Sequence, residues 1–177
     1  LFNTTHVPVG IDQKQHVEIA IEIVKGINHH LKEKITVPVP LIDQNSELII
    51  GIDGQKMSKN YNNTLPVFSS EKELKKRIGK IKTDSTELGQ PLNWADCNVA
   101  KIFSYLTDDA QQSALKLKYE TGEIGYGHAK KELLDSYLNY FKKSKATFDH
   151  LIQNPQKIDN LMAVGLKDIL AVANKNL

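Results

Sequence analysis

The stretch HVPVGIDQKQHVEIAIEIVKGINHHLKEK, residues 6–34, decides the fold because it joins an extended run to an amphipathic helix. Pro8 disfavours the helical conformation for the residue before it, so residues 6–9 are predicted to be extended. After Gly10, apolar residues recur at helical spacing through residues 17–31. A strand, a tight glycine turn and a helix in this order are typical of the first two elements of a βαβ unit.

A second apolar run lies beyond this helix. The run ELIIGI, residues 47–52, predicts the second strand of the unit and therefore a parallel sheet. The stretch GIDGQKMSKNYNN, residues 51–63, begins where this strand ends. Ligands bind at this end of the strands in α/β sheets, so we expect a binding loop here.

The remaining sequence has the pattern of helices. Ser70 and Glu73 form a capping-box pattern ahead of a predicted helix over residues 71–82. Further helices are predicted from near Asp109 to Gly122, over residues 127–153, and from Pro155 onward. Gly165 is expected to separate the helix that starts at Pro155 from a last helix over residues 166–177.

The composition shifts at residues 89–91, where a polar linker with glycine and proline interrupts the pattern. We expect a domain boundary there. Residues 1–88 are predicted to form an α/β part with a parallel sheet, and residues 89–177 an all-helical domain. With 177 residues and 40% hydrophobic content, the chain is long enough to bury a core.

Charge and composition limit the possible classes. The formal net charge of +2 is too small to indicate nucleic-acid binding by itself, and Arg77 is the only arginine among 23 basic residues. No apolar run of about 18 residues occurs. The single cysteine, Cys97, fits a reducing compartment, so a cytoplasmic location without membrane contact is expected. The six histidines lack the spacing of metal ligands, and no metal site is expected.

Two lysines in residues 51–63 suggest a chemistry for this segment. Lys56 and Lys59 flank Met57 and Ser58. Two flexible ammonium groups on a loop can follow a triphosphate and neutralise the charge that develops on a leaving pyrophosphate. Ser58 adds a hydroxyl donor, and Met57 an adaptable apolar anchor. A solvated surface turn is the alternative interpretation, because lysine-rich loops are common.

The first turn offers a second candidate site. Gly10 follows a strand and precedes a helix, so a ligand can approach the backbone and an anion is attracted. Asp12 can accept hydrogen bonds from ribose hydroxyls, and Gln13 offers both donors and acceptors. The alternative is that Asp12 caps the helix and Gln13 lies on the surface.

Both segments together point to a family. VPVGIDQKQHVE, residues 7–18, followed by IDGQKMSKNYNNT, residues 52–64, resembles the class I aminoacyl-tRNA synthetases, and among them the tryptophanyl branch. KTDS, residues 82–85, and IGYGHAKKEL, residues 124–133, also resemble this branch. The resemblance therefore extends over nearly the whole chain.

The resemblance implies which residues contact the substrates. Those expected to bind ATP are Gly10, Ile11, Asp12, Leu48, Ile49, Lys56, Met57, Ser58, Lys59 and Asn60, of which Lys56 and Lys59 would be catalytic. Val7, Val9 and Gln13 would form part of a tryptophan pocket. The family usually has serine where this chain has Asn60, which keeps a small polar side chain and tolerates turns.

The resemblance also implies a fold and an activity. The fold would be α/β, with the C-terminal half of a Rossmann-type nucleotide-binding domain over residues 1–88, followed by a helical anticodon-binding domain over residues 89–177. The enzyme would activate tryptophan with ATP, accompanied by Mg²⁺, and transfer it to tRNA(Trp). Members of the family are homodimers, so the full-length protein is expected to be one.

Two features of the family are absent from these residues. One is the His-Ile-Gly-His signature, and the other is the segment whose acidic residue recognises the indole N–H of tryptophan. The chain is therefore expected to be a C-terminal portion that is inactive alone. Two alternatives remain: a relative of the tyrosyl branch, and a non-catalytic binding paralogue.

Overall fold

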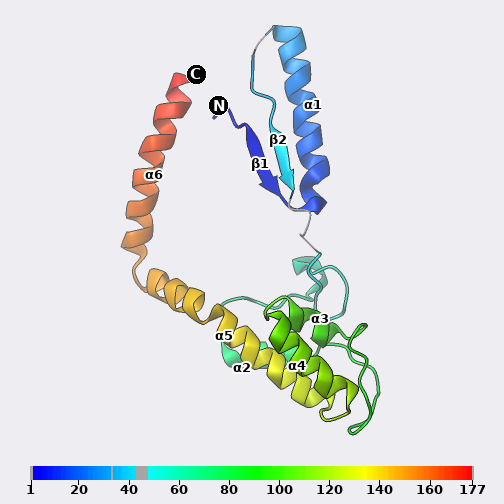
Figure 1. Cartoon of the computed structure of the whole chain (residues 1–177). Helices are drawn as coiled ribbons and strands as arrows, with labels where there is room; N and C mark the ends of the chain where they lie inside the picture. The colour runs from blue at the N-terminus through cyan, green and yellow to red at the C-terminus, as the bar shows by residue number, and fades with distance from the viewer. Residues whose placement is uncertain (1, 33, 43–47, 177) are drawn as a thin grey trace. The chain divides into compact units, whose positions relative to one another are not determined.

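The computed structural model describes residues 2–32, 34–42 and 48–176. The chain divides into two compact units (Figure 1). We call residues 1–47 with 155–177 the sheet unit, and residues 48–154 the helical unit.

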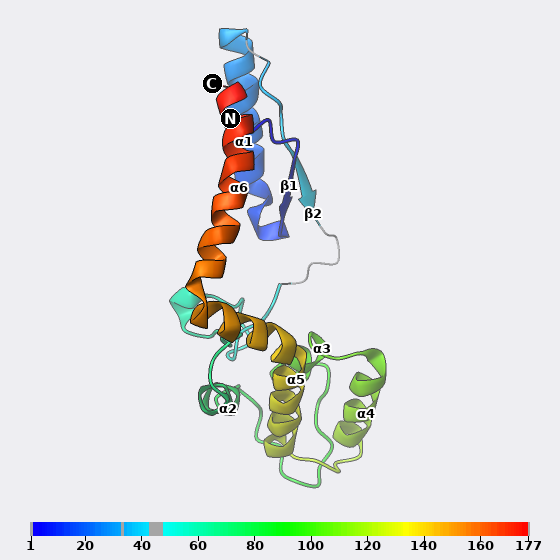
Figure 2. The same ribbon diagram turned by 90° about the vertical axis from the view of Figure 1, so that its left-hand side faces the viewer.

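The sheet unit contains two parallel strands and a helix. Strand β1, His6–Val9, pairs with β2, Val39–Ile42, in a register that places His6 beside Val39. Helix α1, Lys14–Leu31, connects the strands and packs along the sheet (Figures 1 and 2). The predicted βαβ unit is therefore present.

The second strand of the unit lies earlier in the chain than predicted. It is β2, and the predicted run 47–52 contributes only an isolated antiparallel bridge between Ile50 and Lys56, while Glu47 lies outside the described residues. Pro38 and Pro40 are the reason that β2 was not predicted, because a proline in an apolar run argues against a β-strand. Strands with a free edge tolerate proline, and among the described residues the sheet has only two strands.

The start of α1 also differs from the prediction. A 3₁₀ turn, Ile11–Gln13, precedes the helix, and Asp12 lies inside this turn. The N-cap residues are Gly10 for the turn and Gln13 for α1, and neither makes a side-chain capping bond. Asp12 is therefore not the helix cap, because the chain begins to coil before reaching it.

Helix α6, Pro155–Lys175, completes the sheet unit. It starts at Pro155 as predicted, but it continues through Gly165, so the predicted break there was wrong. A glycine in a helix interior destabilises the helix by only about 1 kcal/mol relative to alanine. The helix-favouring residues on either side of Gly165 can offset this cost. The amide of Asn3 donates a hydrogen bond to Asn176 Oδ1 at 3.2 Å, beyond the end of α6.

Because α6 is continuous, replacing Gly165 by alanine should stabilise it. A Cβ at this position meets no atom within 4 Å. We expect Gly165→Ala to raise the free energy of unfolding of the full-length protein by about 0.5–1 kcal/mol, and Gly165→Pro, the matched control, to lower it. Thermal melts would measure both. A melting temperature lowered by alanine would contradict a continuous helix.

Four helices surround one hydrophobic core in the helical unit. They are α2, Glu71–Gly79; α3, Asn98–Ser104; α4, Asp109–Glu120; and α5, Tyr126–Gln153. Helices α2 and α3 pack against α5 (Figure 2). Val99, Tyr119 and Leu133 are fully buried. Helices α2, α4 and α5 confirm the predictions, and the Ser70 side chain accepts the predicted capping bond from Glu73 N at 3.3 Å.

The fold class is α/β, as predicted: a parallel strand pair of a Rossmann-type domain is followed by helices. The expected boundary at residues 89–91 lies inside the helical unit. The predicted functional domains, residues 1–88 and 89–177, differ from these two compact units, and this division stays a prediction. In the part of the chain that the structure describes, no helix has the length and apolarity needed to cross a membrane.

Candidate functional site

Residues 51–63, here called the lysine loop, start as a tight reversal of the chain. Gly51 N donates to Gln55 O at 2.8 Å, and Met57 N donates to Ile49 O at 2.9 Å. Ser58 then caps a short 3₁₀ turn, Lys59–Tyr61, by accepting a bond from Asn60 N at 3.3 Å. The four residues Lys56 to Lys59 therefore connect this reversal to the 3₁₀ turn, which begins at Lys59.

Asn63 ties this loop together from inside. It is 1% exposed and, tyrosine and cysteine aside, is the only polar or charged side chain buried among the described residues. Its Oδ1 accepts from Ser58 N at 2.7 Å. Its Nδ2 donates to Asp53 Oδ1 at 2.8 Å and to Lys56 O at 3.0 Å. Its own carbonyl accepts from Ile52 N at 2.9 Å.

Gly51 makes room for this buried amide. A Cβ on Gly51 would overlap the Asn63 side chain and lie 2.6 Å from its carbonyl oxygen. We expect Gly51→Ala to lower the free energy of unfolding by about 1–3 kcal/mol, because the packing must shift. Urea unfolding of the full-length protein would measure this. Gly127→Ala is the matched control, since a Cβ there meets nothing within 4 Å; equal midpoints for the two variants would contradict the close approach.

The side chains of the lysine loop divide into exposed and half-buried ones. Lys56, Lys59 and Asn60 are exposed, whereas Met57 and Ser58 are half-buried. Met57 and Ile49 line one cavity of about 230 Å³ in the helical unit. The remaining lining residues are Leu65, Val67, Ile102, Tyr105, Leu106, Tyr137, Tyr140 and Phe141. Leu48 is exposed, and its carbonyl accepts from Tyr105 Oη at 3.4 Å.

The Asp53 carboxylate accepts hydrogen bonds within the loop, from Asn63 Nδ2 and from Gln55 N. The hydrogen bond from the Asn63 amide, followed by that from Gln55 N, holds the pKa of the Asp53 carboxyl below its ordinary value. Desolvation acts in the opposite direction. Asp53 is therefore ionised at neutral pH and acts as an acceptor only.

The predicted residues of the first turn lie in the sheet unit. Gly10 precedes the 3₁₀ turn, and Gln13 N donates to Gly10 O at 2.9 Å. The Gln13 side chain bonds Asp12 Oδ2 at 3.4 Å and His16 Nδ1 at 3.0 Å. Ile11 is exposed within the same turn. The structure thus brings Gly10, Asp12 and Gln13 together at the end of β1.

Val7 and Val9, the predicted pocket residues, lie two apart on β1 and are both half-buried. Alternate residues of a strand share one face of the sheet, so their side chains point the same way. The two groups of predicted residues therefore belong to different units: the first turn with β1 to the sheet unit, and the lysine loop to the helical unit.

Two further sequence segments meet within the helical unit. The Tyr126 hydroxyl, from residues 124–133, donates to Asp84 Oδ2 in the segment 82–85 at 2.8 Å. The hydrogen bonds from Thr86 and then Tyr126 hold the pKa of the Asp84 carboxyl below its ordinary value. Burial, above all, raises the pKa of Tyr126. Both residues line a cavity of about 300 Å³.

Sequence reasoning missed Asp53 and Asn63. Asn60, Asn62 and Asn63 are equally polar in the sequence, and no local pattern separates the buried one from the exposed ones. Across the described residues, no group of three or more His, Cys, Asp or Glu side chains could hold a metal ion.

Comparison with known proteins assigns the chain to a family. The family model of class I tRNA synthetases for tryptophan and tyrosine (W and Y) matches residues 1–142. The chain belongs to this family. Its relatives include the tryptophan–tRNA ligase of Campylobacter jejuni, 39% identical over the whole chain, and that of Fusobacterium nucleatum, 40% identical over 98% of the chain.

Solved structures of the synthetase family agree with this assignment. The tryptophanyl-tRNA synthetase of Campylobacter jejuni, solved with ADP and tryptophan, superimposes with a TM-score of 0.90 and covers 98% of the chain. The chain spans about half the length of the relatives it matches, 56% of the Campylobacter ligase and 53% of the Fusobacterium ligase, and corresponds to their C-terminal part.

Proposed function

We propose that the full-length protein is a tryptophan–tRNA ligase. It would join tryptophan and ATP to give tryptophanyl-adenylate and pyrophosphate, and then transfer the tryptophanyl group to tRNA(Trp). The observation that carries the proposal is the 39% identity over all 177 residues to a tryptophan–tRNA ligase, with the lysine loop in place. The names of the relatives do not favour the tyrosyl alternative.

In this proposal the lysine loop acts on the phosphates of ATP. The tryptophan carboxylate attacks the α-phosphorus, and the bond to the leaving pyrophosphate breaks. Lys56 and Lys59 would neutralise the negative charge that grows on the leaving group, which is the electrostatic form of catalysis. Both side chains are exposed, so a ligand can reach them. Met57, Ser58 and Asn60 would shape the loop around the phosphates.

The first turn would bind the other end of the nucleotide. Gly10, Ile11 and Asp12 would contact ribose and adenine, with Leu48 or Ile49 near the adenine. Val7, Val9 and Gln13 would contribute to the tryptophan pocket. Mg²⁺ would arrive with ATP, held by its phosphates.

The remaining parts of the proposal rest on the family. Residues 89–177 would form the domain that contacts the anticodon arm of tRNA(Trp), and the full-length protein would be a homodimer. The protein would act in the cytoplasm, because tRNA and ATP are both available there. The chain alone would be inactive, because it spans about half of the ligases that it matches.

Aminoacylation by the full-length protein tests the proposal. We expect labelled tryptophan to be attached to tRNA(Trp) when ATP and Mg²⁺ are present. Labelled tyrosine with tRNA(Tyr) is the matched control and should give no product. Charging with tyrosine alone would replace the proposal by the tyrosyl alternative. No charging with either amino acid would favour the non-catalytic paralogue.

A further inference from the structure

We propose that Asn63 is a positioning residue of the enzyme: its buried amide sets the backbone of Lys56 and Ser58 and thereby aims the catalytic lysines. This inference rests on the proposed function, because it concerns the same loop. Asn63 itself is expected to touch no substrate, since its side chain is enclosed.

The hydrogen bonds of Asn63 reach both sides of the catalytic segment. Its Nδ2 holds Lys56 O at 3.0 Å, and its Oδ1 holds Ser58 N at 2.7 Å. These two bonds enclose Met57, whose own N–H is held by Ile49 O at 2.9 Å. The backbone from Lys56 to Ser58 is therefore fixed at three consecutive residues, and Lys59 follows directly in the 3₁₀ turn that Ser58 caps.

The chemistry of these contacts requires an amide. Ser58 N needs an acceptor, whereas Lys56 O and the ionised Asp53 carboxylate both need donors. Among short side chains only asparagine offers one acceptor and two donors. An aspartate in its place would direct a second carboxylate at Asp53 and leave the Lys56 carbonyl without this donor.

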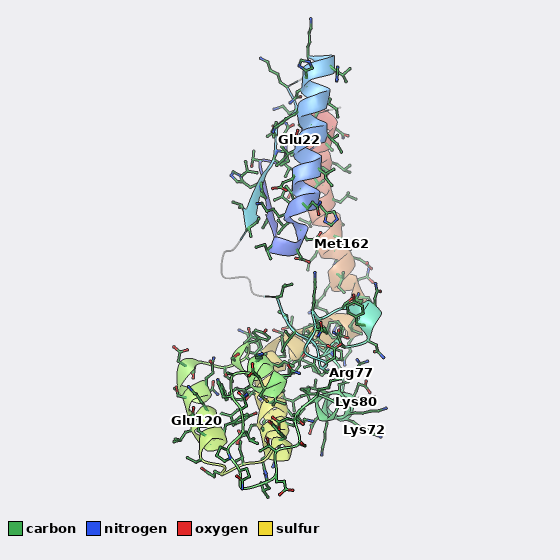
Figure 3. The ribbon with its side chains drawn as sticks, turned by 90° about the vertical axis from the view of Figure 1, so that its right-hand side faces the viewer. Glu22, Lys72, Arg77, Lys80, Glu120 and Met162 are labelled. Carbon is green, nitrogen blue, oxygen red and sulfur yellow. The ribbon has the colours of Figure 1, made fainter. Side chains whose placement is uncertain are left out.

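The position of Asn63 is in turn anchored to α2. Arg77, labelled on this helix in Figure 3, donates from Nη1 to Thr64 O at 3.1 Å. Its Nε bonds Glu73 Oε1 at 2.9 Å, which orients the guanidinium. Thr64 directly follows Asn63 in the chain. The bond from Arg77 to the Thr64 carbonyl therefore also restrains the backbone of Asn63. Hydrogen bonds therefore connect the lysine loop, through Asn63 and Thr64, to Arg77 on α2.

The test compares variants of the full-length protein in tryptophan-dependent exchange of pyrophosphate into ATP. We expect Asn63→Ala to lower kcat at least about 10-fold, because small errors in geometry cost large factors in rate. The KM for tryptophan should stay within about two-fold, because its predicted pocket residues, Val7, Val9 and Gln13, belong to the sheet unit.

A control separates this role from a loss of stability. Leu133→Ala removes fully buried volume from α5, outside the loop, and it should lower the stability at least as much as Asn63→Ala while kcat stays near the wild-type value. Circular dichroism would verify that each variant is folded at the assay temperature. If Asn63→Ala keeps the wild-type kcat, or if Leu133→Ala loses as much, the inference is overturned.

If Asn63→Ala does not fold, a double variant that exchanges the residues at positions 53 and 63 tests the same inference. Asn63→Asp places two carboxylates together, and adding Asp53→Asn restores a donor and an acceptor between the two positions. We expect the double variant to recover at least about 10-fold in kcat over Asn63→Asp alone, as a double-mutant cycle would reveal. Equal values for the two would overturn the inference. No exchange by the wild-type protein would instead overturn the proposed function, and this inference with it.

Discussion

Replacing Lys59 by alanine in the full-length protein should lower kcat for tryptophanyl-adenylate formation about 100-fold or more. Removing one preorganised group that stabilises transition-state charge typically costs this much. The effect should fall on kcat more than on the KM for tryptophan, because the charge on pyrophosphate develops only during the reaction. Lys56→Ala should act in the same direction. Pyrophosphate exchange at saturating ATP and tryptophan would measure both.

A lysine elsewhere in the helical unit provides the control for this loss. Lys116 lies on α4, is exposed and pairs with Glu120 at 3.7 Å. Lys116→Ala removes the same charge and should leave kcat unchanged, because surface ion pairs contribute little. If Lys59→Ala retained the kcat of Lys116→Ala, the lysine loop would have no role in catalysis.

The second large effect concerns the hydrophobic core of the helical unit. Leu133 lies on α5 and has no exposed surface. Leu133→Ala should lower the free energy of unfolding by about 2–5 kcal/mol, the sum of the lost transfer energy and the cavity left behind. Urea unfolding followed by circular dichroism would measure it in the full-length protein.

An exposed leucine in the same unit provides the comparison. Leu117, on α4, is 61% exposed, and Leu117→Ala should change the free energy of unfolding by less than about 0.5 kcal/mol. Similar losses for the two variants would show that α5 does not carry the core of the helical unit.

Helices were largely predictable from the sequence, whereas the second strand was not. The cap at Ser70 and the proline at Pro155 are local signals, and local signals set where a helix starts. Strand β2 contains Pro40 and pairs with a strand about 30 residues earlier, so its existence depends on a partner that no local pattern reveals. The break predicted at Gly165 was wrong for a different reason: a single glycine costs a helix only about 1 kcal/mol, too little to end it.

The candidate site divides in the same way. Its lysines and its first turn could be located by resemblance, because their residues occur in a recognisable order. Asn63 could not, because its importance lies in burial and in bonds to Asp53, Lys56 and Ser58 that form only in the fold. Asp12 shows the converse: its sequence position suggested a cap, and the early 3₁₀ turn removes that role.

Tryptophan-dependent exchange of labelled pyrophosphate into ATP tests the central claim most directly. The full-length protein would be compared with this chain alone, with tyrosine as the control amino acid. We predict exchange by the full-length protein with tryptophan only, and none by the chain alone. If the full-length protein exchanged with neither amino acid, the proposed activity would be wrong, although the chain belongs to the synthetase family.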